Sequence, residues 1–371
     1  MKLTDRIKYK AIELGFDFVG VSPAHQSPRA HDYYKWLKQG FHGNMKWLAN
    51  DPERRSNPTK VLPQAQSVIS VGLSYFIKNP QPEIWNDPSR GRIARYAWGQ
   101  DYHDVIEPML KTLSVFIQHE AGEEIKTRYY VDTGPVLERD IASQAGLGFV
   151  GKNTLLIHPD LGSYVFLGEI ITDLELDFDE PPSSTESDHK AQIGTCGNCR
   201  RCLDVCPTHA FPVPYILNSK LCISYLTIEL KGSIPLKLRP LMKNWIYGCD
   251  ACQEMCPWVR RYSKPGQTRF LEYDPDFAAP RLMDLIKFDN DDFKKRFKGS
   301  PITRTKRRGL LRNAAVALGN WGNTEAIPVL KKAAEDPEPL IREHAAWAIE
   351  QIETSGEQRS EVLKGSLLPA P

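Results

Sequence analysis

The sequence predicts a mixed α/β (α+β) fold in its first half, followed by a small domain built around cysteines and by an α-helical repeat. Three observations lead to this prediction. Helical and strand patterns alternate over residues 1–175, all eight cysteines fall between 196 and 256, and two similar alanine-rich segments lie near the C-terminus. With 371 residues, of which 41% are hydrophobic, the chain is long enough for two or three cores. We expect domains at 1–180, 181–290 and 291–371.

The first domain begins with an amphipathic helix. In LTDRIKYKAIELG, residues 3–15, apolar side chains recur at helical spacing and a glycine ends the pattern. Strands are expected at FDFVGVS, SVISVGLSY, TRYYVD and SYVFLGEIIT, with helices at 101–120 and 135–145. The acidic segment 173–190 contains proline and serine and lacks apolar periodicity, which is typical of a connector between domains.

Charge and hydropathy exclude several classes of protein. The net charge is only +2, so the chain as a whole is not a polycation that binds acidic partners without specificity. The opening MKLTDRIKYK is charged and no signal region follows it, and no run approaches the roughly 20 apolar residues that span a bilayer. We therefore expect a cytoplasmic protein without a membrane segment, whose cysteines bind metal instead of forming disulfides.

The spacing of the cysteines is typical of an iron–sulfur protein. Residues 196–207 follow C-x2-C-x2-C-x3-C-P, a pattern in which three thiolates hold one four-iron cluster and the fourth reaches another. A second run ends at Cys256-Pro257 but lacks its first cysteine, because Ile246 occupies that position. Cys222 is left over and completes the count of eight. A pair of zinc sites is the alternative, but zinc sites rarely show three cysteines at this spacing followed by C-P.

The predicted ligand sets exchange one cysteine between the two runs. The first cluster would use Cys196, Cys199, Cys202 and Cys256, and the second would use Cys206, Cys222, Cys249 and Cys252. Two adjacent clusters form an electron path, but they do not name a reaction.

Three short motifs in the first domain bear on its ligand. GLGFVG at 146–151 matches the dinucleotide fingerprint, but a helix precedes it and an extended segment follows, which reverses the required order. A backbone-exposing loop against another flat or bulky ligand is the better interpretation. DYHDVI at 101–106 lacks the glycine of the motif in which histidine binds the cobalt of cobalamin, so His103 is expected to be a surface or helix-capping residue. Asp132 either caps the following helix or acts as an acid that a large ligand must cover.

A strongly basic stretch leads into the C-terminal repeat. Residues 293–312 carry nine Lys or Arg and no acid, and LLRNAAVALG and IREHAAWAIE align at a period of 31 residues, as in helical solenoids. The charges could form a solvated face, or they could contact the phosphates of a folded RNA. The candidates for RNA contact are Lys294, Lys295, Arg296, Arg304, Lys306, Arg307 and Arg308.

Together, VDTGPVLERDIASQAGLGFVGKN, GSYVFLGEIIT, CGNCRRCLDVCPTHA, CISYLT and YGCDACQEMCPW, followed by the repeat, resemble the epoxyqueuosine reductase family over nearly the whole chain. The resemblance implies reduction of epoxyqueuosine to queuosine in the anticodon loop of tRNA. It also implies an N-terminal cobalamin-binding domain related to reductive dehalogenases, base-off cobalamin, two [4Fe-4S] clusters and a HEAT-like repeat.

The resemblance assigns roles to individual residues. It implies that Asp132 is the proton donor, with an external low-potential electron donor such as flavodoxin or ferredoxin and a monomeric enzyme. The cofactor contacts that it suggests are Arg55, Asp132, Lys152, Asn153, Thr154, Ser163 and Ser224.

Two alternatives remain open at this point. A corrinoid dehalogenase-like enzyme acting on a small molecule would share the clusters and the cobalt but would not need the basic repeat. A ferredoxin-type electron carrier would leave the first domain without a role.

Overall fold

The computed structural model describes residues 1–371 except 79–80, 123, 181–194, 267–273 and 366–371. The chain forms two compact units, each assembled from separate stretches. Unit 1 consists of 1–78, 99–220 and 250–272, and unit 2 consists of 79–98, 221–249 and 273–371. The three consecutive domains expected from the sequence are therefore not the compact units of the structure.

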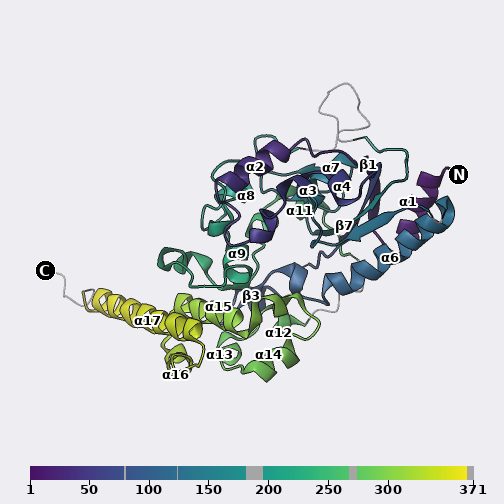
Figure 1. Ribbon diagram of the computed structural model, residues 1–371. Helices are drawn as coiled ribbons and strands as arrows, with labels where there is room; N and C mark the ends of the chain where they lie inside the picture. Colours follow the sequence, from purple (N-terminus) through teal and green to yellow (C-terminus); the bar gives the residue numbers. More distant parts are fainter. Residues whose placement is uncertain (79–80, 123, 181–194, 267–273, 366–371) are drawn as a thin grey trace. The chain divides into compact units, whose positions relative to one another are not determined.

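Unit 1 is built around an antiparallel four-stranded sheet in the order β1-β2-β7-β4 (Figure 1). The long strands β2 and β7 pair along their whole length, from Ser67 opposite Thr172 to Ser74 opposite Val165. All eight residues of β2 are buried, which explains why its sequence is an almost continuous apolar run. The strands are β1 (Phe18–Pro23), β2 (Ser67–Ser74), β4 (Thr127–Tyr130) and β7 (Val165–Thr172).

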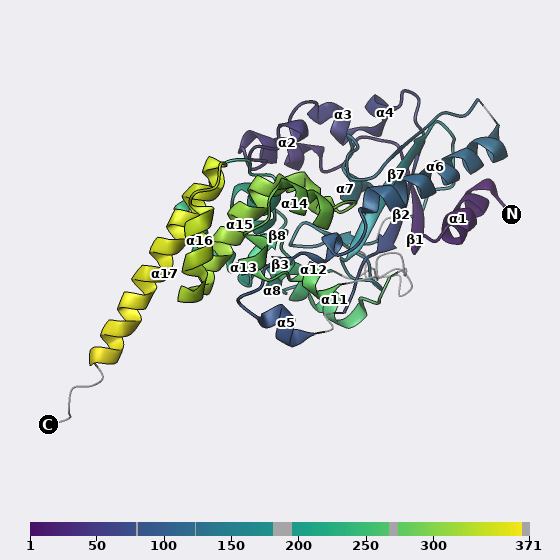
Figure 2. The same cartoon turned by 90° about the horizontal axis from the view of Figure 1, so that it is seen from below.

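Helices cover both faces of this sheet (Figures 1 and 2). Helix α6 (Tyr102–Ala121) packs on the face of β7 that carries Gly168, where a side chain would press against Leu110. Helix α7 (Glu138–Gln144) contacts β1, β2 and β7, and its Ile141 joins an apolar cluster with Val68. Because side chains alternate along a strand, Glu169 lies on the same face as α7.

The remaining elements of unit 1 are short and surround the sheet. They are α1 (Leu3–Glu13), α2 (Ala30–Lys38), η1 (Lys46–Leu48), α3 (Pro52–Ser56), α4 (Pro58–Val61), β5 (Phe149–Val150), β6 (Leu156–Ile157), α8 (Arg201–Asp204), α10 (Ala251–Glu254) and α11 (Pro257–Tyr262).

Unit 2 is mainly helical, and its central contact is between α15 and the long helix α17. A two-stranded parallel sheet, β3 with β8, adds residues from two distant parts of the chain. The elements are α5 (Pro82–Asn86), β3 (Arg92–Ile93), η2 (Arg95–Ala97), α9 (Ile223–Ile228), η4 (Leu236–Leu238), η5 (Pro240–Met242), β8 (Trp245–Tyr247), α12 (Pro275–Ala278), α13 (Leu282–Leu285), α14 (Asn290–Arg296), η7 (Pro301–Thr305), α15 (Lys306–Trp321), η8 (Thr324–Ala326), α16 (Ile327–Ala333) and α17 (Pro339–Gly365); the short helix η3 (Ser219–Leu221) lies where the chain passes from unit 1 to unit 2.

Every strand and helix expected in the first half is present within a few residues of its predicted bounds. The GLGFVG loop follows α7 and leads into the β5–β6 hairpin, which confirms the reversed order that argued against a dinucleotide site. The boundary expected at 180–190 lies almost entirely outside the described residues. Its described beginning is anchored to β1, because Asp179 exchanges hydrogen bonds with the backbone of Val21. None of the described helices is long and apolar enough to cross a membrane.

Candidate active site

Asp132 lies in the loop between β4 and α7, in a backbone conformation that few non-glycine residues adopt. Its φ is +56°, its side chain is exposed, and its Oδ2 accepts a hydrogen bond of 2.9 Å from the hydroxyl of Tyr102. The residue that caps α7 is Leu137, so Asp132 is not the helix cap that one interpretation of the sequence favoured. The left-handed conformation instead directs this carboxylate toward Tyr102 at the start of α6.

Arg55 binds the backbone of the Asp132 loop. Its guanidinium Nη1, on α3, donates hydrogen bonds to the backbone oxygens of Gly134 at 2.9 Å and Val136 at 3.5 Å. The side chain that was expected to contact the cofactor therefore fixes the shape of the Asp132 loop. Neighbouring Gly134 leaves room for Tyr130, because a Cβ there would overlap the Tyr130 side chain.

The loop after α7 carries the next group of expected cofactor contacts. Asn153 is 3% exposed, and its Nδ2 has no hydrogen-bond partner among the described residues. An unpartnered buried amide is costly, so this donor suits a ligand that brings an acceptor. Thr154, at φ +66°, turns its carbonyl oxygen to Arg139 Nη1 at 2.5 Å, which ties the loop to α7.

Lys152 joins this loop to the first cysteine run. Its backbone N–H points to Cys196 Sγ at 3.4 Å, and its Nζ donates to the carbonyl oxygens of Gly197 at 2.7 Å and Cys199 at 3.0 Å. Its own carbonyl oxygen accepts the N–H of Tyr215 at 3.0 Å. Lys152 is thus committed to holding the cysteine loop, although the sequence suggested a cofactor contact.

Four cysteines of unit 1 lie together. Burial first, and then the neighbouring thiols of Cys196, Cys256 and Cys199, raise the pKa of Cys202 to about 11. This is the grouping expected for the first cluster. Burial raises the pKa of the Cys256 thiol, and the nearby backbone N–H groups of Val259 and Trp258 oppose that rise. Amide donors aimed at sulfur favour thiolates, so this donor set fits an iron–sulfur cluster.

The other four cysteines are divided between the two units. Cys206 and Cys252 belong to unit 1, whereas Cys222 and Cys249 belong to unit 2. Ile246, at the position where the second run lacks a cysteine, is fully buried in β8. It is a core residue of unit 2.

The two serines expected near the cofactor lie in different units. Ser163 is 4% exposed, and its hydroxyl donates to Gln253 Oε1 at 2.8 Å, next to Cys252 on α10. Ser224 is half-buried on α9 in unit 2, two residues after Cys222.

Sequence reasoning missed three residues beside Asp132, namely Tyr102, Glu138 and Glu169. Tyr102 stands between Asp101 and His103, which drew attention because of the histidine. Glu138 is the first residue of α7, and Glu169 is completely buried in β7. An acid in the middle of the apolar run VFLGEIIT was the signal that could have identified Glu169.

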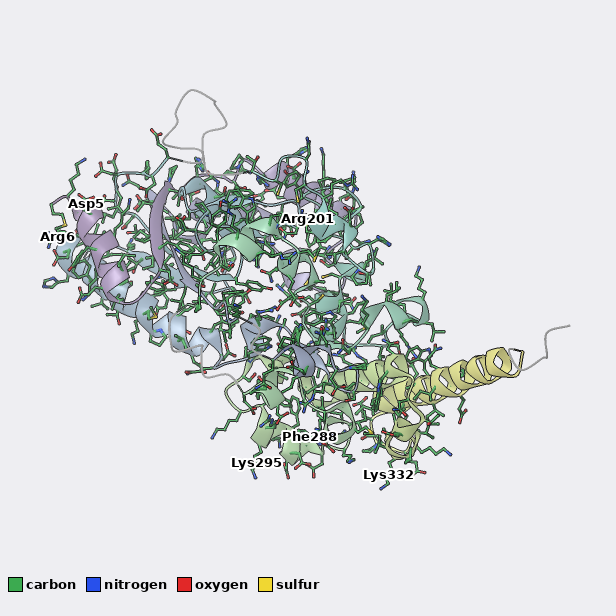
Figure 3. The ribbon with its side chains drawn as sticks, turned by 180° about the vertical axis from the view of Figure 1, so that it is seen from behind. Asp5, Arg6, Arg201, Phe288, Lys295 and Lys332 are labelled. Atoms are coloured by element: carbon green, nitrogen blue, oxygen red, sulfur yellow. The ribbon has the colours of Figure 1, made fainter. Side chains whose placement is uncertain are left out.

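The basic stretch forms part of unit 2 and is less free than its sequence suggests. Arg307 binds Asp336 and the carbonyl oxygen of Phe288, Arg304 pairs with Glu229, and Arg296 pairs with Asp274. Lys294 is exposed and lies 3.6 Å from Asp291. The exposed cations of the stretch for which the structure gives no acidic partner are Lys295, Lys298, Lys306 and Arg308. Figure 3 shows Lys295 on α14 and Lys332 on α16 pointing outward.

Comparisons with known proteins match all three parts of the chain. Residues 55–133 match the family model "Epoxyqueuosine reductase QueG", residues 195–259 match "4Fe-4S double cluster binding domain", and residues 303–369 match "HEAT repeats". The epoxyqueuosine reductase of Pseudomonas aeruginosa is 42% identical over 353 residues, which is 94% of both chains. That of Escherichia coli is 39% identical over 357 residues, covering 94% of this chain and 89% of the other.

Solved structures agree with the sequence relatives. An epoxyqueuosine reductase crystallised with an epoxyqueuosine-modified tRNA-Tyr stem loop superimposes with a TM-score of 0.83 at 33% identity, covering 94% of this chain and 90% of the other. The Bacillus subtilis enzyme, whose structure has its catalytic aspartate loop swung out of the active site, gives 0.82 at 32% identity, covering 94% and 90%.

Proposed function

The chain belongs to the epoxyqueuosine reductase family of oxidoreductases, and from this we propose that it reduces epoxyqueuosine to queuosine in the anticodon loop of tRNA. The observation that carries the proposal is the 42% identity to a relative over 94% of both chains. Removing the epoxide oxygen consumes two electrons and two protons, and it leaves an alkene and one water. The enzyme must therefore supply electrons singly and protons at the correct oxygen.

Asp132 is the proton donor in this proposal. Its carboxyl is exposed, yet its position is set by Tyr102, by Arg55 acting on the loop backbone, and by its own left-handed conformation. As the C–O bond breaks, negative charge develops on the epoxide oxygen, and a carboxylic acid held beside it transfers its proton there. Such general acid catalysis typically contributes about 10²–10⁴-fold to the rate.

Two [4Fe-4S] clusters would conduct the electrons. The first would be held by Cys196, Cys199, Cys202 and Cys256, and the second by Cys206, Cys222, Cys249 and Cys252. The closeness of the first four thiols and the match of 195–259 to a double-cluster domain support this assignment. Because Lys152 touches both the first cysteine loop and the loop of Asn153 and Thr154, that cluster would lie next to the ligand-binding loops.

Cobalamin is the cofactor proposed to receive these electrons. When bound, it supplies low-potential cobalt chemistry at the substrate carbon. Asn153 would offer its unpartnered Nδ2, Thr154 would shape the turn, and Ser224 would contribute from α9. Lys152, Arg55 and Ser163 are assigned to positioning, because each is already bonded to protein groups.

The substrate nucleotide would be presented by tRNA. The modified base must leave its stack to reach Asp132, since chemistry on a base requires access to its reactive atoms. The exposed cations Lys295, Lys298, Lys306 and Arg308 would contact phosphates of the adjoining stem. The external electron donor would be a low-potential flavodoxin or ferredoxin, and the enzyme is proposed to act as a monomer.

The decisive experiment is anaerobic incubation of the reconstituted protein with cobalamin, a strong reductant and epoxyqueuosine-containing tRNA. We expect the nucleoside to lose one oxygen, as read by mass spectrometry. Protein prepared without a corrinoid is the control and should leave the nucleoside unchanged. Loss of oxygen without any corrinoid would reject the cobalamin assignment, and no loss in the complete mixture would reject the proposed reaction.

The cluster assignment has its own test. Cys222→Ser should lower the iron content from about eight to about four atoms per chain, since one cluster loses a ligand. Ser224→Ala, two residues away, is the matched control and should retain the iron. Full iron content in Cys222→Ser would overturn the ligand set of the second cluster.

A further inference from the structure

Two acidic side chains meet beneath the Asp132 loop, in the apolar layer between the sheet and α7. Glu169 is 0% exposed on β7, and Glu138 is half-buried at the first position of α7 with its Oε1 shielded from solvent. Helix α7 packs against β7, and the Glu138 carboxyl is near enough to raise the pKa of Glu169. Neither oxygen of Glu169 has a donor among the described residues, and neither does Oε1 of Glu138.

The strand register explains why Glu169 is so isolated. Its partners across the sheet are Ser70 on β2 and Tyr130 on β4, and the buried hydroxyl of Ser70 likewise lacks a described partner. Along β7, the side chains on the same face are Leu167 and Ile171, which belong to apolar clusters. Burial in this layer therefore disfavours the ionised form of the Glu169 carboxyl.

Two neighbouring buried carboxyls oppose each other's ionisation. Burial, then the Glu138 carboxyl and then Asp132, raise the pKa of Glu169 well above its usual range. Burial first, and the Asp132 carboxylate second, raise the pKa of Glu138 to about 7. Glu169 therefore stays protonated at neutral pH, and Glu138 is the member that can gain and lose a proton near neutrality.

Glu138 also lies beside the donor loop. The backbone N–H of Asp132 is near the Glu138 carboxyl and opposes the rise of its pKa, so the left-handed turn that presents Asp132 borders Glu138. The other titratable or charged groups facing the pair are Tyr102 on α6, Arg139 on α7 and the Asp132 side chain.

We propose that Glu138 and Glu169 form a proton store that reloads Asp132 during the reaction. The proposal rests on the proposed function, because the reduction consumes two protons and Asp132 carries one. After Asp132 has protonated the opening epoxide, the O–H bond of Glu138 breaks and an O–H bond forms on Asp132. Asp132 then provides the second proton, which leaves with the oxygen as water.

The step balances without another reactant. The two electrons come through the clusters, and the negative charge moves from Asp132 to Glu138. There it lies near the protonated carboxyl of Glu169 and the backbone N–H of Asp132, both of which favour the ionised form of Glu138. Glu169 keeps its proton throughout, so it is a positioning residue, whereas Asp132 and Glu138 each take one proton from solvent between turnovers.

Two substitutions at the pair separate this role from a structural one. Glu138→Gln cannot release a proton, and we expect kcat to fall about 10²-fold, without the decline above pH 7 that we expect of the wild type. Glu169→Gln still donates a hydrogen bond to Glu138, so its kcat should fall only about 2-fold to 5-fold and keep that decline. Glu107→Gln, an exposed acid on α6, is the unchanged control. Iron content and corrinoid binding should equal the wild type in all three.

An infrared pH titration tests the pair independently of turnover. We expect the wild type to keep a protonated carboxyl band well above pH 7, and this band should be absent in Glu169→Gln at the same pH. A wild-type pH profile in Glu138→Gln, or a larger loss in Glu169→Gln than in Glu138→Gln, would overturn the proton store, as would absence of the band in the wild type. If the wild type leaves epoxyqueuosine intact while the band is present, the proposed function fails and the protonated pair stands.

Discussion

Buried polar groups are treated in opposite ways in the two units. In unit 2, Arg312 is 0% exposed and donates to the carbonyl oxygens of Leu226, Leu230 and Gly232, each at 2.7 Å. Its neighbour Asn313, also fully buried, uses its Nδ2 for two further carbonyl oxygens. In unit 1, Glu169 is equally buried, but its carboxyl meets only another acid.

This difference indicates which buried groups serve stability and which could serve catalysis. A buried group left without a partner costs about 1–3 kcal/mol, so an unpartnered carboxyl in a core is retained where its reactivity is used. Arg312 and Asn313 tie α15 to the backbone of α9 and its following loop and make unit 2 a firm support. In the proposed mechanism, the acids around Asp132 would transfer protons in unit 1. The predictions below test this contrast.

The largest expected effect is on the reaction rate when Asp132, the exposed acid beside Glu138 and Glu169, is replaced. Asp132→Asn removes the proton donor but keeps the hydrogen bond from Tyr102, so the single-turnover rate should fall about 10²–10⁴-fold. Iron content and corrinoid binding should be unchanged. Asp104→Asn, an exposed acid on α6, is the control. An unaltered single-turnover rate would remove Asp132 as the donor.

The next effect is on stability in unit 2. Arg312→Met leaves three buried carbonyl oxygens without their donor, and we expect the free energy of unfolding to fall by about 3–5 kcal/mol. Arg308→Met, an exposed change on the same helix, should stay within about 0.5 kcal/mol. Denaturant titration measures both. A loss below about 1 kcal/mol for Arg312→Met would contradict the contrast between the units.

A smaller effect is expected on the pH dependence of stability. The pKa of Glu138 rises from 4.5 to about 7 on folding, so the folded protein holds a proton that the unfolded chain releases. The free energy of unfolding should therefore fall as the pH rises from about 4.5 to about 7, by about 2 kcal/mol from this group. In the double variant Glu138→Gln with Glu169→Gln this fall should be absent. Equal slopes in the two proteins would show that the pair is not protonated on folding.

The smallest effect is expected at the surface of unit 2. Alanine at Lys295, Lys298, Lys306 and Arg308 should weaken tRNA binding about 10-fold and flatten its dependence on salt, because fewer phosphate contacts release fewer counterions. Alanine at Lys60 and Lys111, two exposed lysines of unit 1, is the control. Binding isotherms at several salt concentrations measure both the affinity for tRNA and its salt dependence. An unchanged salt dependence would show that the basic stretch is a solvated surface that does not contact tRNA.

Much of the site could be predicted from sequence because its signals are local. The thiol spacing from Cys196 to Cys206 predicted clusters, since ligands within one loop are close whatever the fold. The sequence also showed that Asp132 lies between a predicted strand and a predicted helix. In contrast, Arg55 was expected to reach the cofactor, and only the packing of α3 against the loop revealed its bonds to Gly134 and Val136. The freedom of Arg296, Arg304 and Arg307 was overestimated for the same reason.

The sequence by itself determined the strands, the helices, the cysteine runs and the helical repeat, because periodicity and spacing are properties of neighbouring residues. Only the tertiary structure decided that the first 78 residues join 99–220 and 250–272 in one unit, and that Glu169 meets Glu138 under Asp132. The physical reason is that burial and charge pairing depend on residues far apart in the chain. The proton held by a carboxyl is set by which groups surround it after folding.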